Sequence, residues 1–159
     1  MTSDLASAVQ RLVAIEAIKQ LKHRYCHACD DNYNPDTLAP LFAEDAVWDG
    51  GALGKAQGRQ SIRAFFAAAS GLVRFALHEA SLPVIEVDGD KATGVWALWQ
   101  PMVLTQGDQA MWLVARYDDK YVKVDGAWLI QEVRITTRAF SPYEFGFGRM
   151  LVAPAPGNA

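Results

Sequence analysis

The second half of the chain contains five stretches rich in β-branched and aromatic residues, and these constrain the fold more than any other feature. All lie after Gly71, and they are VRFALHEA, PVIEV, KATGVWALWQPMVL, AMWLVARYDDKYVKV and AWLIQEVRITTRAF. The turn sequences VDGD, TQGDQ and VDGA separate the later stretches, which predicts antiparallel strands joined by hairpins. The longest stretches are more than twice the usual strand length of about five or six residues, so their sheet must curl.

The first half of the chain predicts helices instead. From about Ala8 to Asp30 apolar residues recur at helical spacing, and the turn-forming run DDNYNPD ends this helix. A short helical segment around PDTLAPLF, a strand at AVWDG and a third helix at GRQSIRAFFAAAS follow. Together these patterns predict an α+β domain: a cone-shaped fold of a curved antiparallel sheet with about three helices enclosing an apolar pocket. The predicted core face of the first helix holds Ile15, Ile18, Leu21, Tyr25 and Cys29, and the opposite face holds Glu16, Gln20, His23 and His27.

The composition predicts one domain over residues 1–159, with loose ends at about 1–7 and 151–159. Hydrophobic residues make up 51% of the chain, which favours a large core or an apolar cavity. A formal net charge of −3 argues against nucleic acid or an anionic membrane as a partner, since both bind clusters of Lys and Arg. No apolar run is long enough to span a membrane and no secretory signal is visible, so we expect a cytoplasmic protein.

Both cysteines, Cys26 and Cys29, lie in the run RYCHACDDNY at C-x-x-C spacing. A structural zinc site needs about four ligands, and the chain has no second pair of this kind. A redox pair should lie at a helix N-terminus, where the dipole lowers a thiol pKa, whereas these residues lie near a helix C-terminus. We therefore expect two packing residues, no bound metal and slow thiol reactivity. His23 and His27 share the polar helix face, so we expect them to be solvated or at a subunit contact rather than to bind metal.

Six segments of the chain carry a family resemblance, and in order they are LFAEDAVWDG, GRQSIRAFF, LHEA around His78, IEVDGDKATG, AWLI and FSPYEFGFGR. They resemble the SnoaL-like branch of the nuclear transport factor 2-like superfamily. The resemblance runs from about Leu12 to Arg149 and implies the cone fold, which hosts cyclases, isomerases, dehydratases and binding domains. Within the branch, the chain is most similar to scytalone dehydratase and the bile-acid 7α-dehydratases.

The resemblance also implies a set of site residues. Those dehydratases carry a Tyr and an Asp five residues apart near the end of the first helix, and a His in the strand after the third helix. Tyr25, Asp30 and His78 stand at these positions here. Some members add an Arg late in the last strand, which Arg138 matches, with Arg134 as the alternative. Scytalone dehydratase uses a second His in the sheet, and this chain has none after His78.

Each residue of this trio has a structural explanation when it is taken alone. Tyr25 would be a core aromatic, Asp30 an acid that bonds a nearby backbone N–H, and His78 an ordinary strand residue. Together they supply a phenol donor, an imidazole and a carboxylate to orient it, which proton abstraction beside a carbonyl needs. The candidates for substrate binding are Arg138, Trp48, Trp96, Trp99 and Trp112, although strand alternation places Trp96 and Trp99 on opposite faces of the sheet.

We interpret the chain as a cofactor-independent lyase of the dehydratase type, acting on a hydrophobic cyclic or polycyclic carbonyl substrate by general acid–base catalysis. His78 would remove a proton next to the carbonyl and return it to the departing hydroxyl, while Tyr25 would donate a hydrogen bond to the carbonyl oxygen. Two alternatives stay open: a double-bond isomerase of ketosteroid type, and a non-enzymatic binding or accessory domain such as a ring-hydroxylating dioxygenase small subunit. No cofactor is expected, since the sequence shows neither a phosphate-binding loop nor a G-x-S-x-G motif.

The predicted sheet has helices on its concave face alone, so its convex face needs another cover. Family members cover this face by packing into dimers or trimers. The aromatic-rich segment SPYEFGFGRMLV is suited to reach across such a contact. We expect a homo-oligomer, with a trimer slightly ahead of a dimer.

Overall fold

The structure is a computed structural model that describes residues 2–154, with side chains from Asp4 onward. Its helices are α1 (Thr2–Asp30), α2 (Pro35–Leu38), α3 (Arg59–Ala69) and α4 (Gly146–Arg149), with 3-10 turns η1 (Ala39–Leu41), η2 (Gly51–Leu53) and η3 (Gln106–Asp108). Its strands are β1 (Phe42–Asp49), β2 (Lys55–Gln57), β3 (Val73–Ala76), β4 (Glu79–Asp88), β5 (Lys91–Leu104), β6 (Gln109–Val124) and β7 (Ala127–Pro142).

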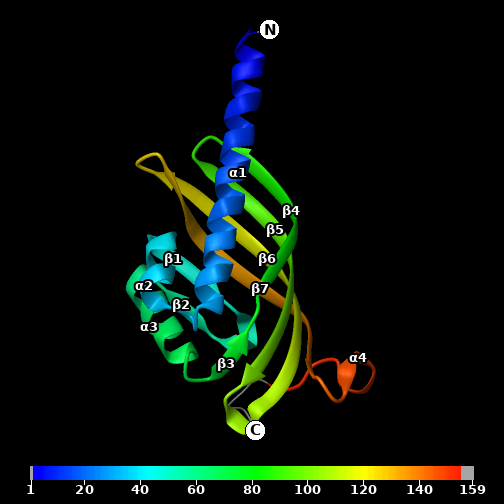
Figure 1. The fold of residues 1–159 in the computed structure, drawn as a ribbon. Helices are drawn as coiled ribbons and strands as arrows, with labels where there is room; N and C mark the ends of the chain where they lie inside the picture. Colours follow the sequence, from blue (N-terminus) through cyan, green and yellow to red (C-terminus); the bar gives the residue numbers. More distant parts are fainter. Residues whose placement is uncertain (1, 155–159) are drawn as a thin grey trace.

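All of these strands belong to one curved sheet. Its order is β2-β1-β7-β6-β5-β3, with β4 also paired to β5. The three long strands β5, β6 and β7 have 14, 16 and 16 residues, and the sheet curves around α1 (Figure 1). The predicted α+β cone is therefore confirmed. One pair departs from the antiparallel arrangement, because β1 lies parallel to β7 and makes the sheet mixed. Strands so far apart in the sequence leave no hairpin signal that reveals their relative direction.

The first helix is longer than its pattern predicts. It begins at Thr2 rather than at Ala8, so the segment expected to be loose is helical. Its first turns extend past the end of the sheet (Figure 1), and Leu5, Val9 and Leu12 are exposed there. The later turns pack against the sheet on the predicted face, with Ile18, Leu21, Tyr25 and Cys29 buried and Ile15 partly buried.

The end of α1 sets the position of several site residues. Asn32 and Tyr33 follow Asp30 with φ angles of 54° and 53°, which are left-handed. Asn tolerates this conformation, whereas a bulky residue such as Tyr adopts it only where surrounding structure enforces it. The Asn34 side chain then accepts a hydrogen bond from the Asp36 N–H at 3.1 Å and starts α2. The chain thus reverses within a few residues and keeps this turn against the sheet.

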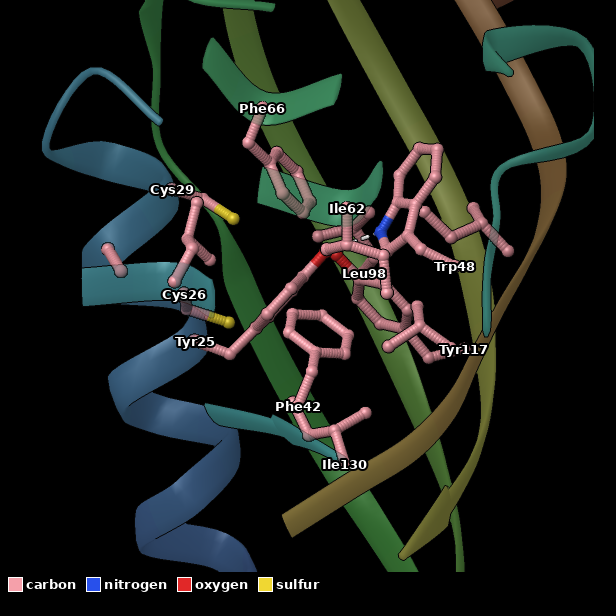
Figure 2. Close-up of a cluster of buried hydrophobic side chains, with 14 of the residues drawn as sticks. Tyr25, Cys26, Cys29, Phe42, Trp48, Ile62, Phe66, Leu98, Tyr117 and Ile130 are labelled. Carbon is pink, nitrogen blue, oxygen red and sulfur yellow. Dashed lines mark hydrogen bonds between the residues drawn. The ribbon is translucent and has the colours of Figure 1, made fainter. Parts of the chain in front are cut away.

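The main core lies between α1, α3 and the concave face of the sheet (Figure 2). α3 contributes Ile62 and Phe66 as buried residues, with Phe65 and Ala69 partly buried, on the face that its sequence predicted. Full burial of a side chain of this size contributes roughly 1.5–3 kcal/mol. The apolar stripes of the two helices therefore hold them on the sheet.

The chain after β7 returns to that strand. α4 lies beyond the end of the sheet, away from α2 and α3 (Figure 1). The Phe140 N–H donates to the Leu151 carbonyl at 2.8 Å, and the Ala153 N–H donates to the Phe140 carbonyl at 2.6 Å. This part of the expected loose tail is therefore paired, and residues 155–159 lie outside the described residues. Within residues 2–154, no helix is long and apolar enough to cross a membrane.

Candidate active site

A cavity of about 190 Å³ lies inside the cone, between the end of α1, α3 and the concave face of the sheet. Aromatic and aliphatic side chains make most of its wall. Among the described residues that line it, none is Lys, Arg, Asp or Glu. Such a cavity suits a neutral, largely apolar ligand that carries a few hydrogen-bonding groups. The polar groups in the wall belong to Tyr25, Tyr33, Trp48, His78, Gln100 and Tyr117.

A wider groove of about 760 Å³ lies elsewhere, along β4, β5 and β6. Charged side chains line it, including Arg11, Lys91 and Lys120. The described lining of this groove contains none of the site residues that the sequence predicts. The smaller cavity is therefore the candidate active site.

Asp30 and His78 are 48 residues apart in the chain and meet beside this cavity. The Oδ1 atom of Asp30 accepts hydrogen bonds from the backbone N–H of His78 at 2.9 Å and from its Nδ1 at 2.8 Å. Because Nδ1 serves as the donor to the carboxylate, Nε2 carries the free lone pair of the imidazole. The His78 side chain is 5% exposed and that of Asp30 is 21% exposed. His78 lines the cavity, whereas Asp30 holds it from behind.

His78 does not lie within a strand, contrary to the sequence-based expectation. β3 ends at Ala76 and β4 begins at Glu79, so His78 lies in the break between them. The Leu77 N–H donates to the Pro101 carbonyl at 3.1 Å, but the next N–H, that of His78, donates to the α1 carboxylate. Asp30 therefore replaces a strand partner, and this exchange fixes the direction of the imidazole.

Tyr25 places a phenol in the same cavity. It is 1% exposed, and its hydroxyl accepts a hydrogen bond from the Trp48 indole Nε1 at 3.0 Å (Figure 2). Its own proton is left for the weak sulfur acceptor of Cys29 or for a ligand. Burial raises the pKa of Tyr25 well above its usual value. The phenol therefore keeps its proton near neutral pH and can act as a hydrogen-bond donor.

Trp48 lines the cavity, as its sequence position suggested. Its ring packs on Phe65 with a centroid distance of 4.6 Å. Gly50 makes this placement possible, because a Cβ there would lie 2.5 Å from the Cη2 atom of the indole. The glycine after β1 therefore serves the packing of a cavity residue.

Arg138 does not line the cavity, and the prediction that it binds substrate is wrong in this respect. Ala139 and Thr137 pair with consecutive residues of β6, so Arg138 is the extra residue of a β-bulge. The bulge shifts the alternation of the strand, and Ile135 and Phe140 both line the cavity although they are five residues apart. The side chain of Arg138 is exposed.

The alternative, Arg134, is exposed as well and also lies outside the cavity wall. Its guanidinium pairs with Glu132 of the same strand at 3.0 Å. Neither arginine therefore lines the cavity, and the described wall contains no cationic side chain of the kind that the sequence suggested.

Three of the four candidate tryptophans are not in the cavity wall. Strand alternation does put Trp96 and Trp99 on opposite faces, since Trp96 is 1% exposed and Trp99 is 37% exposed. Trp96 points inward but farther along the sheet, where its Nε1 donates to the Tyr121 hydroxyl at 3.0 Å. Trp99 stacks on Trp112 on the outer face, with a centroid distance of 4.9 Å. The candidate role of these three tryptophans in the cavity wall is therefore corrected: Trp99 and Trp112 point away from the concave face, and Trp96 points inward at another place.

Three polar residues of the cavity wall were not predicted from the sequence. Gln100 is 4% exposed, and its inward direction follows from the alternation that places Trp96 and Leu98 on the inner face. Tyr117 lies on the inner face of β6 by the same rule. Tyr33 had no such signal, because it lies in the turn after α1 and reaches the cavity through an unusual backbone conformation.

A second polar pair, also missed, lies between α1 and the sheet but outside the cavity wall. The side chains of Lys22 and Asp119 are both 0% exposed, with 2.8 Å between Nζ and Oδ2. The Tyr121 hydroxyl donates to Oδ2 of Asp119 at 2.8 Å. Burial raises the pKa of Asp119, and the ammonium of Lys22 opposes that shift.

The cysteines are packing residues in the structure. Both are free and buried, and burial raises the pKa of Cys26 to about 11 and that of Cys29 well above its usual value. His23 and His27 are exposed on the opposite side of α1. In the described part of the chain, no group of three or more His, Cys, Asp or Glu side chains could hold a metal ion. That the purified protein carries no zinc stays a prediction.

Comparison with known proteins places this chain in a family. Residues 10–134 match the profile of the SnoaL-like domain. The chain belongs to this family. The predicted family is thus confirmed, and similar solved structures share the fold of this SnoaL-like domain.

Three structures illustrate the likeness. A protein of Novosphingobium aromaticivorans DSM 12444 described as a "Putative Scytalone Dehydratase" is 25% identical, with a TM-score of 0.79 over 96% of this chain and 99% of that chain. The Type2 form of LinA, a hexachlorocyclohexane dehydrochlorinase, is 22% identical, with a TM-score of 0.81 over 94% and 99%. A nuclear transport factor 2-like superfamily protein of Salmonella enterica serovar Typhimurium is 17% identical, with a TM-score of 0.71 over 77% and 89%.

Proposed function

We propose that this SnoaL-like domain is a cofactor-independent lyase of the dehydratase type that acts on a neutral carbonyl compound. The observation that carries the proposal is the Asp30–His78 dyad, whose imidazole lines an uncharged cavity that also contains the Tyr25 phenol. Two proteins of the same fold bear the names of a dehydratase and a dehydrochlorinase, which supports an elimination reaction.

The reaction begins with proton abstraction. Nε2 of His78 removes a proton from the carbon next to the carbonyl, and the electrons of that C–H bond form an enolate. The Tyr25 hydroxyl donates a hydrogen bond to the enolate oxygen, and a donor of this kind in a dry site is worth about 3 kcal/mol. Asp30 keeps the imidazole in one tautomer and stabilises the imidazolium that forms.

The second step expels the leaving group. The enolate electrons restore the carbonyl and form a C=C bond while the bond between the β-carbon and its hydroxyl oxygen breaks. The imidazolium of His78 returns its proton to that oxygen, which leaves as water. The step regenerates neutral His78 and needs no oxidant, reductant or further co-reactant.

The size and polarity of the cavity narrow the substrate class. Its volume of about 190 Å³ is somewhat larger than the roughly 150 Å³ of a cavity that binds benzene. One substituted ring or a compact pair of rings fits, which narrows the initial expectation of a cyclic or polycyclic substrate. An ionic substrate would lose its hydration without gaining a charged partner in the described wall. We therefore propose small, uncharged ring-bearing ketones.

The first test measures turnover of 4-hydroxy-4-phenylbutan-2-one, a neutral one-ring β-hydroxy ketone, at the head of a panel of such compounds. Loss of water forms a conjugated enone that is followed by its near-ultraviolet absorbance. The unaltered protein should form enone, and folded His78→Ala should form it far more slowly. His27→Ala, which changes an exposed histidine of α1, is the matched control. A folded His78→Ala protein with unaltered turnover would contradict the proposal, and binding without turnover by the unaltered protein would favour a binding domain.

We also propose a homo-oligomer that uses the outer aromatic cluster, defined as Trp99, Trp112, Tyr143 and Phe147. The Trp112 ring lies 5.4 Å from that of Tyr143, and the Trp99 ring lies 6.2 Å from that of Phe147. Tyr143 is 61% exposed and Phe147 is 43% exposed. A contiguous exposed apolar patch of this kind marks interaction surfaces. Light scattering at micromolar concentration should report a trimer or a dimer, and a monomer would contradict this.

A further inference from the structure

Gln100 and Tyr33 form a second polar position in the cavity, next to His78. Ala76 of β3 pairs with Met102 of β5, and Glu79 of β4 pairs with Trp99 of the same strand. This register places the backbone of His78 directly across from that of Gln100. Both side chains line the cavity. A ligand atom that reaches the imidazole therefore also lies near the Gln100 amide.

The amide of Gln100 has hydrogen-bonding capacity that the protein does not use. Its side chain is buried, with 4% of the residue exposed, and its Nε2 donates to the Met102 thioether at 3.7 Å. A thioether is a weak acceptor. The amide also hydrogen-bonds the Tyr33 phenol. Among the residues that the structure describes, no other group hydrogen-bonds this amide. Because Gln100 lines the cavity, the hydrogen-bonding positions that these contacts leave open can serve a ligand there.

Tyr33 lies at the same position with a strained backbone. Its φ angle of 53° is left-handed, a conformation that a bulky side chain adopts against its steric preference. Its ring stacks on Phe66 with a centroid distance of 6.1 Å and meets the His78 ring edge-on at 5.7 Å. Burial raises the pKa of the Tyr33 phenol, which therefore keeps its proton. Strain of this kind collects at functional sites, where surrounding contacts maintain it.

We propose that Gln100 and Tyr33 bind the hydroxyl group that leaves in the reaction, so that the substrate is a β-hydroxy ketone. This inference rests on the proposed lyase function and names its leaving group. The Gln100 amide oxygen accepts a hydrogen bond from the hydroxyl group of the bound substrate. The Gln100 N–H or the Tyr33 O–H donates a hydrogen bond to the hydroxyl oxygen while the bond between this oxygen and carbon breaks. His78, across from Gln100, then delivers the proton that completes water. A double-bond isomerisation moves a proton between carbons and releases no hydroxyl group, so it needs no partner for a leaving hydroxyl.

The test compares two probes that differ in this hydroxyl alone, 4-hydroxy-4-phenylbutan-2-one and 4-phenylbutan-2-one. Calorimetry measures the Kd of each for the His78→Ala protein, which consumes the hydroxy ketone far more slowly under the proposed mechanism. We expect the hydroxy ketone to bind about 5-fold more tightly than the ketone, the scale of one or two net hydrogen bonds. Adding Gln100→Leu should remove this preference and leave the Kd of the ketone within about 2-fold.

Gln131→Leu is the matched control, because Gln131 lies in β7 outside the cavity wall and its amide contacts Asp45 at 3.1 Å. It should leave the preference intact. If Gln100→Leu does not fold, Tyr33→Phe provides the same readout with a smaller expected loss. The proposal is overturned if the preference persists in folded Gln100→Leu, or if the starting protein shows no preference for the hydroxy ketone. In one further outcome, the unaltered protein forms no enone while the preference for the hydroxy ketone still depends on Gln100. That result would contradict the lyase function and support the hydroxyl site.

Discussion

Two polar pairs join α1 to the sheet, and they differ in what surrounds them. The dyad of Asp30 and His78 and the sealed pair of Lys22 and Asp119 each have 2.8 Å between the interacting atoms. The dyad lies beside the cavity and presents a ring nitrogen to it. The sealed pair has no exposed side-chain surface. Its ammonium lies 3.3 Å from the centroid of the Tyr117 ring and 4.7 Å from that of Tyr25.

A close contact between two ionisable side chains therefore does not by itself identify a catalytic group. A group that acts on a ligand must keep one donor or acceptor directed at a space that the ligand can occupy. His78 meets this condition, whereas Lys22 is covered by the aromatic rings that form the back of the cavity wall. Lys22 and Asp119 therefore belong to the packing that positions Tyr25 and Tyr117. The dyad should control turnover, and the sealed pair should control stability.

The largest expected effect is on turnover by dyad variants. His78→Ala should lower turnover by on the order of 10²–10⁴, the usual scale of general acid–base catalysis. Asp30→Asn should cost a comparable factor, because the imidazole loses the acceptor that fixes its tautomer. The double variant should be little worse than either single one, since residues that act as a unit are non-additive. Steady-state kinetics on the four proteins measures this cycle, and multiplicative losses would mean that the residues act independently.

The next effect is on stability, through the sealed pair. Lys22→Met should lower the free energy of unfolding by about 3–5 kcal/mol, because it leaves the Asp119 carboxylate buried without its cation. Lys22→Met combined with Asp119→Leu should recover most of that loss, since no buried charge remains. Urea unfolding followed by circular dichroism measures both.

Lys120→Met is the matched control for the sealed pair. Lys120 is the neighbour of Asp119 in β6 and pairs with Glu132 at 2.6 Å, but its side chain is 60% exposed. Its loss should change stability far less, because water solvates the Lys120 ammonium and Arg134 still pairs with Glu132 at 3.0 Å. Equal effects from Lys22→Met and Lys120→Met would remove the distinction between the sealed pair and an ordinary surface ion pair.

A smaller effect per residue is expected from the phenols that surround both pairs. Burial raises the pKa of Tyr25, Tyr33, Tyr117 and Tyr121 above the usual value of a phenol. Above about pH 10 the unfolded chain loses these protons while the folded chain keeps them, so stability falls as the pH rises. The free energy of unfolding falls by at most about 1.4 kcal/mol per pH unit for each phenol. This loss is absent below about pH 10, where both the folded and the unfolded chain keep these protons.

A pH titration followed by phenolate absorbance and circular dichroism checks this expectation. The four phenolates should appear together with the loss of structure. Tyr33→Phe and Tyr121→Phe each remove one phenol, beside the dyad and the sealed pair respectively, and should reduce the slope equally. Ionisation of these phenols in a protein that keeps its structure would contradict the assigned burial.

The smallest effects are expected from His27 and Cys29, which belong to neither pair and lie outside the cavity wall. His27→Ala and Cys29→Ala should leave turnover within a few-fold, since His27 is exposed and Cys29 packs behind Tyr25 without lining the cavity. Exposed substitutions such as His27→Ala usually change stability by about 0.5 kcal/mol or less. Thermal melts and steady-state kinetics on both variants provide the check. A large loss of turnover in folded Cys29→Ala would extend the site to the thiol.

Much of the fold followed from local patterns. Long alternating stretches with turn signals predicted the curled sheet, and the spacing of Ile18, Leu21 and Tyr25 predicted the buried face of α1. The parallel pairing of β1 with β7 and the break at His78 could not be predicted, because both depend on contacts between distant segments. The trio of Tyr25, Asp30 and His78 came from the family resemblance. The structure places Tyr25 and His78 in the wall of one cavity, and Asp30 bonds His78 from outside that wall.

The sequence by itself determined which residue types face inward along each regular element. Alternation in β5 was enough to separate Trp96 from Trp99, and the same rule would have found Gln100. Only the tertiary structure decided which inward residues reach the cavity and which are covered by α1. The bulge at Arg138 shows why, since one extra residue reverses the direction of every side chain beyond it. Side-chain direction along a strand is a local property, whereas a bulge and a cavity are set by how distant segments pack.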